Sequence, residues 1–441
     1  MSQNISWQRH SAAAATKYSS LVNPSNPATR RALVIESGDQ LSRRLLLTYI
    51  LLLAAGTSLI PLTIDPFLPV FPEIAEFYGV PNASVQFTLT GVLVGFAVGQ
   101  ILAGPLSDAF GRRRPLLIAL SIYLVAAMAL FLAPNIETFA ILRILMGVGA
   151  AASNVIAQAI VRDLFSGLPM MQMLARVYLL QSLVPVFAPI LGSQLAEFLH
   201  WQQLFLVFGF FVLLVLLAAN RFLVETLPPA RRRSQTALGL ARGYRAVLRD
   251  RIFVGLMIFG ALQLLALFTY LNTVPFLFQD SYGISQTEFG LFFAFNALVS
   301  WAGVQIGARL PKIFPAQWLL AAYALIGALV GVGLFLTAGM GIWITEALFA
   351  IQLLCFGATI TSHQTLALLN HGSEAGTAAS LLGVSSFLFV SAMSPVIASL
   401  DTQSTGGIGL LVGLGYGGAL LALMLIVRPW LVPDLRTSAS A

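Results

Sequence analysis

The stretch from Leu45 to Phe71 reads LLLTYILLLAAGTSLIPLTIDPFLPVF and is apolar along almost its whole length. As a helix it is long enough to cross a bilayer core, which takes about 20 apolar residues, and its one charged side chain is that of Asp65. The composition agrees, since 58% of the 441 residues are hydrophobic and 9% are charged, against about 25% charged residues in soluble proteins. The chain is therefore predicted to be an integral membrane protein rather than a soluble enzyme, a nucleic-acid-binding domain or a disordered chain.

Eleven further apolar runs follow, and a polar stretch separates the sixth run from the seventh. We expect an all-α membrane protein whose twelve transmembrane helices form two pseudo-symmetric six-helix bundles. The predicted spans are residues 45–71, 84–104, 115–133, 138–161, 168–197, 203–222, 252–278, 287–309, 315–338, 341–369, 376–400 and 405–427. The expected parts are a cytoplasmic tail at 1–44, a first bundle at 45–222, a cytoplasmic central loop at 223–251, a second bundle at 252–427 and a cytoplasmic tail at 428–441.

The basic residues predict the orientation of these helices. If both termini face the cytoplasm, every one of the 24 Lys and Arg residues except Arg143 falls on the cytoplasmic side. This asymmetry is what the positive-inside rule predicts. It also accounts for the net charge of +7, because these side chains face anionic lipid headgroups and not nucleic acid.

The two halves of the chain resemble each other with a period near 204 residues. Tyr78-Gly79-Val80 precedes the second predicted span, and Tyr282-Gly283-Ile284 precedes the eighth. Gly99 and Gly303 share that offset. The repeat predicts two parallel six-helix units related by an axis along the membrane normal, with a substrate site near the bilayer midplane between them.

The segment after the second span reads GPLSDAFGRRRP, from Gly104 to Pro115. It resembles the signature of major facilitator transporters, with Ala109 at a position that is usually basic. Gly104 and Gly111 are expected to allow close backbone approach and a tight turn. Asp108 is expected to cap a helix or pair with an Arg, locking the two halves on the cytoplasmic side. The adjacent basic residues, Arg112 and Arg113, are expected to contribute to this lock and to contact lipid headgroups; an ordinary positive-inside loop is the plainer alternative.

Asp65 and Arg143 are the charged groups expected deepest in the first bundle. A carboxylate in hydrocarbon costs at least about 2.5 kcal/mol and usually faces a cavity or a partner. At 1.5 Å per residue, Asp65 lies roughly 12 Å from Glu73 and Arg143 about 9 Å from Glu137, so the two are expected at similar depth. They are interpreted as a proton- or substrate-binding carboxylate beside a buried guanidinium, with a static ion pair as the alternative.

Two further segments resemble motifs of proton-coupled drug exporters. Leu142-Arg143-Ile144-Leu145-Met146-Gly147 resembles the fourth-helix motif of that family, in which the Arg is associated with proton transfer, although Met146 stands where Gln is common. In the fifth span, Pro185, Pro189 and Gly192 resemble the antiporter motif in its shortened form. The prolines are expected to bend the helix and the glycine to allow close packing on a neighbour.

The seventh span contains Tyr270-Leu271-Asn272-Thr273-Val274-Pro275, and the eighth contains Phe295-Asn296. Together with Asp65-x-x-x-Pro69 these look like the Bcr/CflA branch of drug:proton antiporters, named for bicyclomycin and chloramphenicol resistance. The resemblance covers residues 45–427 and implies export of small amphipathic antibiotics or metabolites across the bacterial inner membrane.

Polar residues inside spans are the candidate substrate contacts, and each can instead bond a neighbouring helix. Adding 203 to 143 leads to Glu346, a carboxylate expected at the outer membrane interface. The single Cys355 and four scattered His residues indicate no metal site, and no cofactor is expected. The candidate substrate-binding residues are Asn154, Gln158, Gln181, Asn272 and Asn296.

The sequence therefore predicts a proton-coupled efflux transporter that works by alternating access. Its expected partners are a small-molecule substrate, protons and membrane lipids, and it is expected to act as a monomer. The alternatives are a proton-coupled importer or a metabolite exporter of the same fold. A membrane enzyme is disfavoured because the His residues do not cluster with acids, and neither the substrate nor the proton stoichiometry can be deduced from the sequence.

Overall fold

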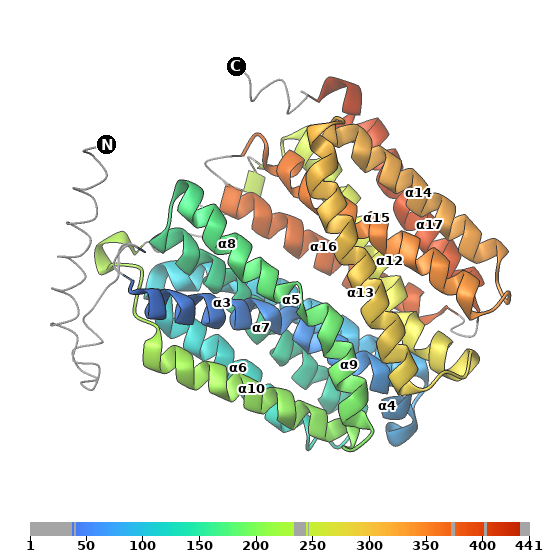
Figure 1. The fold of residues 1–441 in the computed structure, drawn as a ribbon, viewed down its shortest axis with the longest axis horizontal. Coiled ribbons are helices and arrows are strands. Elements are labelled where there is room, and N and C mark those ends of the chain that lie inside the picture. Colours follow the sequence, from blue (N-terminus) through green and yellow to red (C-terminus); the bar gives the residue numbers. More distant parts are fainter. Residues whose placement is uncertain are drawn as a thin grey trace.

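Twelve helices long and apolar enough to cross a membrane occur in the computed structural model (Figure 1). The structure describes residues 38, 41–232, 244–245, 247–371, 375–400 and 404–432. Most of the predicted tails at 1–44 and 428–441, and much of the predicted central loop at 223–251, lie outside these residues. Within the described part all regular elements that could span a membrane are helical, which confirms the predicted fold class.

The first bundle contains the first six spans, drawn in blue to yellow-green in Figure 1. Side chains cap several helix starts; for example, Asn135 accepts a hydrogen bond from the Thr138 amide at the start of the fourth span. The elements are α3 (Arg43–Ile64), the 3₁₀ segment η2 (Asp65–Val70), α4 (Phe71–Tyr78), α5 (Asn82–Phe110), α6 (Arg113–Leu130), α7 (Ile136–Leu164), α8 (Gly167–Gln181), α9 (Val184–Ala196) and α10 (Trp201–Phe222).

The second bundle contains the last six spans, drawn in yellow to red beside the first. Its eighth span begins with a capping box, in which Ser285 and Glu288 satisfy each other's backbone amides. The elements are α12 (Arg251–Phe276), the π-helical turn η4 (Leu277–Ser281), α13 (Gln286–Arg309), η5 (Leu310–Lys312), α14 (Ala316–Leu336), α15 (Ile342–Leu368), α16 (Ala375–Ala398), α17 (Thr405–Ala422) and the π-helical turn η7 (Leu423–Val427).

The first span is not one straight helix. It changes from α-helix to 3₁₀-helix at Asp65, and returns to α-helix at Phe71. Proline cannot donate the amide hydrogen bond of a continuing helix and its ring clashes with the preceding turn, and Pro66 and Pro69 both lie in this segment. The span therefore changes its winding at the position of its one buried acid.

The fifth span, predicted as a single run, is also broken. Helix α8 ends at Gln181, and α9 begins at Val184, with Pro185 in its first turn. Proline is tolerated there because the first amides of a helix have no intrahelical acceptor. The helix is thus interrupted just before Pro185, whereas α9 continues through Pro189.

The internal repeat predicted from the sequence is present in the backbone. Gly79 and Gly283 both follow the first span of their bundle and both have left-handed backbone angles, with φ of 61° and 69°. Gly99 packs against the backbone of α7, and Gly303 packs against the backbone of α15, which occupies the equivalent place in the second bundle. The first pair of glycines therefore forms the same turn in both bundles, and the second pair forms the same close helix contact.

The two bundles meet through a symmetric pair of contacts. Helix α5 packs on α16, and α9 packs on α13. Each contact joins the second span of one bundle to the fifth span of the other, as a two-fold relation between the bundles requires. We call the end of the molecule that carries the α5–α6 turn the Arg112 end, and the opposite end, which carries α4 and η4, the Glu73 end.

Candidate functional site

Asp65 lies at the start of η2, where the first span faces the second bundle. Its side chain is 7% exposed, and η2 contacts both α12 and α13 of the second bundle. Among the described residues, none donates a hydrogen bond to its carboxylate and none forms an ion pair with it. A buried carboxylate without a donor is costly when it is charged, so the charged form of Asp65 is unfavourable unless a donor or a cation reaches it.

Arg143 lies in α7 and is fully buried. Its Nη1 donates a hydrogen bond of 2.7 Å to the carbonyl oxygen of Thr63, so it is at the depth of Asp65, as predicted. Its guanidinium lies 5.4 Å from the ring centre of Phe67 and 6.0 Å from that of Phe139, distances at which cation–π attraction operates. Its Nε and Nη2 have no hydrogen-bond partner among the described residues.

The two deeply buried charges of the first bundle, Asp65 and Arg143, therefore lie at a similar depth without being paired. The alternative of a static ion pair between Asp65 and Arg143 is wrong for this structure, in which the described ion pairs include none between them. The reason is local: the guanidinium is directed to the Thr63 carbonyl and to aromatic rings of its own bundle.

Glu346 is the second buried acid of the structure, and it is not the surface carboxylate expected from the sequence. It lies near the start of α15, close to the outer end of the span as predicted. Its side chain is nevertheless only 5% exposed, because α13 packs on α15. Asn296 of α13 donates one hydrogen bond of 3.1 Å to Glu346 Oε2 and another of 3.1 Å to the Tyr270 hydroxyl. We call Tyr270, Asn296 and Glu346 the second-bundle cluster.

The second-bundle cluster is directed toward the first bundle through Tyr270. This side chain is 2% exposed, and its hydroxyl lies within electrostatic range of both Asp65 and Glu346. One acid from each bundle is therefore brought to the same tyrosine across the bundle interface. This arrangement of Asp65, Tyr270 and Glu346 cannot be predicted from their separation in the sequence.

Hydrogen bonds between the bundles gather toward the Glu73 end. Gln86 donates to the Asn272 carbonyl oxygen at 3.0 Å, and Gln279 donates to the Pro69 carbonyl oxygen at 2.9 Å. Three side-chain pairs add to these two bonds and share their location. They are Asn82 with Asp280, Gln286 with Glu73, and Thr287 with Glu197. The structure is thus closed between the bundles at the Glu73 end.

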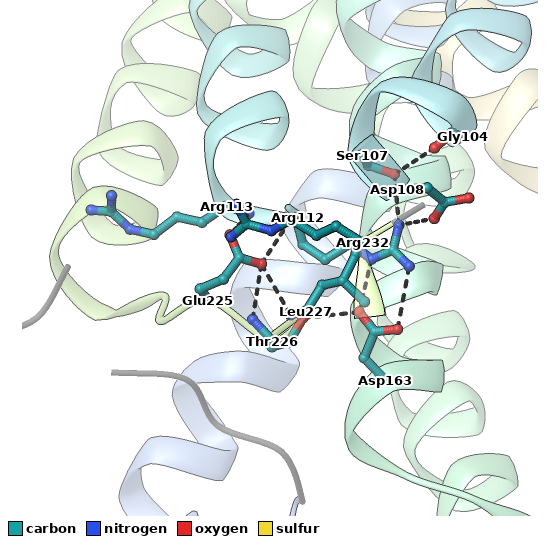
Figure 2. Close-up of polar contacts among 10 residues, drawn as sticks. All are labelled: Gly104, Ser107, Asp108, Arg112, Arg113, Asp163, Glu225, Thr226, Leu227 and Arg232. Atoms are coloured by element: carbon teal, nitrogen blue, oxygen red, sulfur yellow. Dashed lines mark hydrogen bonds and ion pairs between the residues drawn. The ribbon is translucent and has the colours of Figure 1, made fainter. Parts of the chain in front are cut away.

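At the opposite end, Arg112 is the centre of a polar network (Figure 2). Its Nη1 contacts Asp108 at 2.5 Å and Ser107 at 2.8 Å, and its Nε donates to Asp163 at 2.8 Å. Burial by itself lowers the pKa of the Arg112 guanidinium, but Asp163 and Asp108 outweigh this effect and raise the pKa above its ordinary value. Arg112 is therefore a permanent charge that ties α5 to the end of α7.

Glu225, just beyond α10, completes this network. It accepts hydrogen bonds from the backbone amides of Arg112 and Arg113 at 2.7 and 3.3 Å, and it also accepts from the amides of Thr226 and Leu227. Arg113 continues the contact through a bond from its Nε to the Leu223 carbonyl oxygen. These contacts join the α5–α6 turn to the chain that leaves the first bundle.

The motif from Gly104 to Arg113 differs in two ways from its expected arrangement. Residues up to Phe110 continue α5, so Gly104 and Asp108 lie in a helix rather than a loop. Gly104 has open space beside it, whereas Gly111, with φ of 89°, makes the predicted tight turn. The ion pair of Asp108 with Arg112 joins residues of one bundle, so this pair stabilises the first bundle. The lock between the two halves stays a prediction.

Gly192 of the predicted antiporter motif packs as expected. A side-chain carbon at this position would overlap the backbone of Pro66 in η2. On the same helix, Ser193 contacts Gly290 of α13, close to the Pro189 carbonyl oxygen. Helix α9 therefore supports the segment that carries Asp65 and contacts the helix that carries Asn296.

The remaining predicted substrate residues are not gathered at one point. Asn154 accepts a hydrogen bond from Gln158 one turn along α7, and Asn272 donates to the Phe268 carbonyl oxygen of its own helix. Gln181 lies at the end of α8, and its side-chain amide oxygen is buried without a partner among the residues that the structure describes. Of this group, the structure connects Asn296 to a buried acid.

Asp163 and Glu225 of these networks were not identified from the sequence, and the parts that Tyr270 and Glu346 play in them were not predicted. Asp163 and Glu225 do carry a signal, because they are acids at an end of the molecule where most charges are basic. Tyr270 carries none, since one tyrosine in an apolar span looks like many others.

Comparison with known proteins agrees with the fold. A family model described as the Major Facilitator Superfamily matches residues 45–395. The chain is 35% identical over 352 residues to the uncharacterized MFS-type transporter YdgK of Bacillus subtilis, with 78% of this chain and 87% of YdgK covered. It is 29% identical over 362 residues to the bicyclomycin resistance protein homolog of Haemophilus influenzae, with 81% and 91% covered.

Two solved structures share the architecture at low sequence identity. A bacterial homolog of the human lysosomal transporter Spinster, inward-facing and unoccupied, gives a TM-score of 0.71 at 17% identity and covers 88% of this chain and 98% of its own. The D-xylose-proton symporter gives a TM-score of 0.69 at 16% identity, with 88% and 99% covered. These similarities concern the fold alone.

Twelve spanning helices in two related bundles, with buried polar groups where the bundles meet, define a multi-pass membrane transporter of small molecules and not an enzyme. The chain belongs to the Major Facilitator Superfamily. Its match to the bicyclomycin resistance protein homolog, and a 27% match to the multidrug resistance protein MdtL of Salmonella heidelberg, support the branch that its sequence motifs resemble.

Proposed function

We propose that this transporter exports small amphipathic organic compounds in exchange for protons, across a bacterial inner membrane, with both termini in the cytoplasm. The observation that carries the proposal is Asp65, a buried acid at the 3₁₀ segment of the first span that faces the second bundle and has no described ion partner. A group of this kind can gain and lose a proton as its surroundings change between two conformations.

The orientation is assigned from charge. In the described residues, the basic side chains around the α5–α6 turn and the chain after α10 mark the Arg112 end, which we assign to the cytoplasm by the positive-inside rule. The Glu73 end then faces outward, and a hollow there is lined by the acids Glu73, Glu76 and Asp280. Protons would reach Asp65 from this acidic side when the bundles separate there.

The proposed cycle has two alternating forms. With the Glu73 end open, Asp65 takes a proton from outside; with that end closed, as in this structure, Asp65 releases the proton toward the cytoplasm and cargo enters the site. The closed end is held by five described hydrogen bonds between side chains or to backbone carbonyls. Each is worth about 1 kcal/mol, so their loss together costs about 5 kcal/mol, more than the roughly 2.3 kcal/mol that one proton supplies in moving down 100 mV. New contacts in the open form must therefore replace part of them.

The Arg112 network has a supporting part in this cycle. It holds the turn between α5 and α6, the end of α7 and the exit from α10 together. A bundle whose helices are tied at their ends moves as a unit, which alternating access by rocking requires. Export rather than import is proposed from the relatives named for bicyclomycin and multidrug resistance.

The test uses everted membrane vesicles that carry the protein and an internal acid gradient, read by a quenched pH-sensitive dye. Adding ethidium or chloramphenicol should release protons from vesicles with the wild-type protein, and Asp65→Asn should abolish this release while the protein remains inserted. Glu137→Gln, which removes an exposed acid at the start of α7 in the same bundle, is the matched control and should behave as wild type. Normal exchange by Asp65→Asn would remove this residue from the mechanism.

A further inference from the structure

The second-bundle cluster has more hydrogen-bond acceptors than donors. Asn296 uses both of its amide hydrogens, one on Glu346 Oε2 and one on the Tyr270 hydroxyl. The carbonyl oxygen of Asn296 and Glu346 Oε1 are then left buried with no hydrogen-bond partner among the described residues. Buried polar atoms are almost always bonded in folded proteins, so these two acceptors are available for hydrogen bonds from a group outside the cluster.

Packing alone does not account for this arrangement. A purely structural acid at a helix–helix contact is normally fully bonded, because a buried carboxylate with too few donors costs several kcal/mol. Glu346 is 5% exposed and Asn296 is 1% exposed, so the orphan oxygens do not have access to bulk water. A group that enters from the transport pathway can supply what the protein does not.

Aromatic rings of the second bundle lie beside Tyr270. The ring of Tyr270 lies 5.0 Å from that of Phe349 and 6.0 Å from that of Phe293, measured between centroids. The faces of such rings attract cations. A carboxyl group, two acceptors without described partners and the rings beside Tyr270 together suit a nitrogen cation that carries N–H donors and an apolar body.

The charges near this cluster favour a cation over an anion. Asp65, the other acid in electrostatic range of Tyr270, has the same sign as Glu346. The buried cation Arg143 contacts Thr63, Phe67 and Phe139, all in the first bundle. A positively charged cargo is thus the complement of the two acids.

We propose that Glu346, held by Asn296 beside the Tyr270 ring, binds the cationic nitrogen of an amphipathic organic cargo. The proposal rests on the export function above and assigns its cargo class. It divides the work between the bundles: the acid of the first bundle carries the proton and the acid of the second binds the cargo. Because both acids lie near Tyr270, a cation bound at Glu346 stabilises the carboxylate form of Asp65 and promotes release of the proton from Asp65.

The test measures binding of ethidium, a permanently charged cation with amino donors, to the purified full-length protein in detergent by fluorescence. Glu346→Gln keeps the size of the side chain and removes its charge, and it should weaken ethidium binding at least tenfold. Glu346→Asp should retain measurable binding. Glu288→Gln is the matched control, because this exposed acid caps a helix in the same bundle and Gln also serves in that capping box; it should bind as wild type does.

Three outcomes would overturn the proposal. Wild-type protein could fail to bind ethidium, Glu346→Gln could bind it with unchanged affinity, or Asp65→Asn and not Glu346→Gln could lose binding. A loss of proton exchange by Glu346→Gln at unchanged ethidium affinity would make Glu346 a proton carrier instead. The binding assay needs no proton gradient, so its result is separate from a failure of the exchange assay for Asp65.

Discussion

Gly192 of α9 packs directly against the backbone of Pro66, the residue after Asp65 in the chain. The antiporter motif of the fifth span and the buried acid of the first span are therefore parts of one contact. A side chain at position 192 would push against η2 and move Asp65 with it. This gives the motif a physical role that its proline content alone does not explain.

We expect Gly192→Ala to destabilise the protein and to reduce proton-coupled transport. Overpacking a tight contact costs about 1–3 kcal/mol, so the melting temperature of the purified protein should fall by several degrees. Gly417→Ala is the control, because Gly417 has open space around it within helix α17 and alanine favours a helix there by up to about 1 kcal/mol. Equal melting temperatures for the two variants would contradict the close contact with Pro66.

Arg112→Lys should destabilise the first bundle although it keeps the charge. A lysine cannot donate the forked bonds that Arg112 gives to Asp163 and Asp108. These carboxylates are only partly buried, so the loss of bonds to them is expected to cost about 1–3 kcal/mol in total. Thermal unfolding in detergent measures the loss. Arg114→Lys, at an exposed neighbouring position, should leave the transition within experimental error.

The Arg112 network should not respond to physiological changes in pH. The folded-state pKa of Arg112 lies above its ordinary value, so the stabilisation is complete below the unfolded pKa and is lost only when pH rises through the folded one, in strongly alkaline solution. The stability difference between wild type and Arg112→Lys should therefore be constant from about pH 6 to pH 9. A difference that varied across this range would show that another group controls the network.

Arg143→Met should separate stability from function. The guanidinium is fully buried and two of its nitrogens have no described partner, so replacing it with an apolar side chain removes the cost of burying an unpaired charge. We expect an unchanged or higher melting temperature together with at least tenfold slower proton-coupled exchange. Full exchange activity in this variant would assign Arg143 a structural role only.

Gln86→Leu should shift the transporter away from the form closed at the Glu73 end. The variant loses the bond from Gln86 to the Asn272 carbonyl oxygen, and about 1 kcal/mol corresponds to roughly a fivefold change in the population ratio. Spin labels at Glu76→Cys and Glu288→Cys, with Cys355→Ser, should report a larger long-distance fraction.

The control for this shift is Gln352→Leu. Gln352 also donates to a backbone carbonyl, that of Ala266, but both residues belong to the second bundle. Its loss should lower the melting temperature and leave the label distances unchanged. A similar distance shift in both variants would show that the effect comes from general destabilisation rather than from the bundle interface.

The hydrophobic pattern predicted the twelve spans well because burial in lipid demands about 20 apolar residues per helix whatever the tertiary packing. The glycine pairs at 79 and 283, and at 99 and 303, were also readable, since a left-handed turn and a close helix contact both exclude larger side chains. Helix ends were less accurate: α5 continues to Phe110 where the apolar run suggested an end near Gly104.

The candidate site was predicted in part. Asp65 and Arg143 were found because a charge in an apolar run is conspicuous, and their similar depth was deduced from the helical rise. Their lack of pairing could not be deduced, because rotation of each helix about its axis decides where a side chain points. The same uncertainty placed Glu346 at the membrane surface, whereas the packing of α13 on α15 buries it against Asn296.

The sequence was enough to predict which segments cross the membrane, that these segments form two related sets, and which charged residues lie inside apolar spans. These properties depend on local composition and on the periodicity of the chain. Two relationships were visible only in the tertiary structure. Asp65 and Glu346, which are 281 positions apart, both lie within electrostatic range of Tyr270, and Arg112 connects helices of a single bundle. Such meetings depend on how whole helices pack and rotate against one another, which no local pattern of residues specifies.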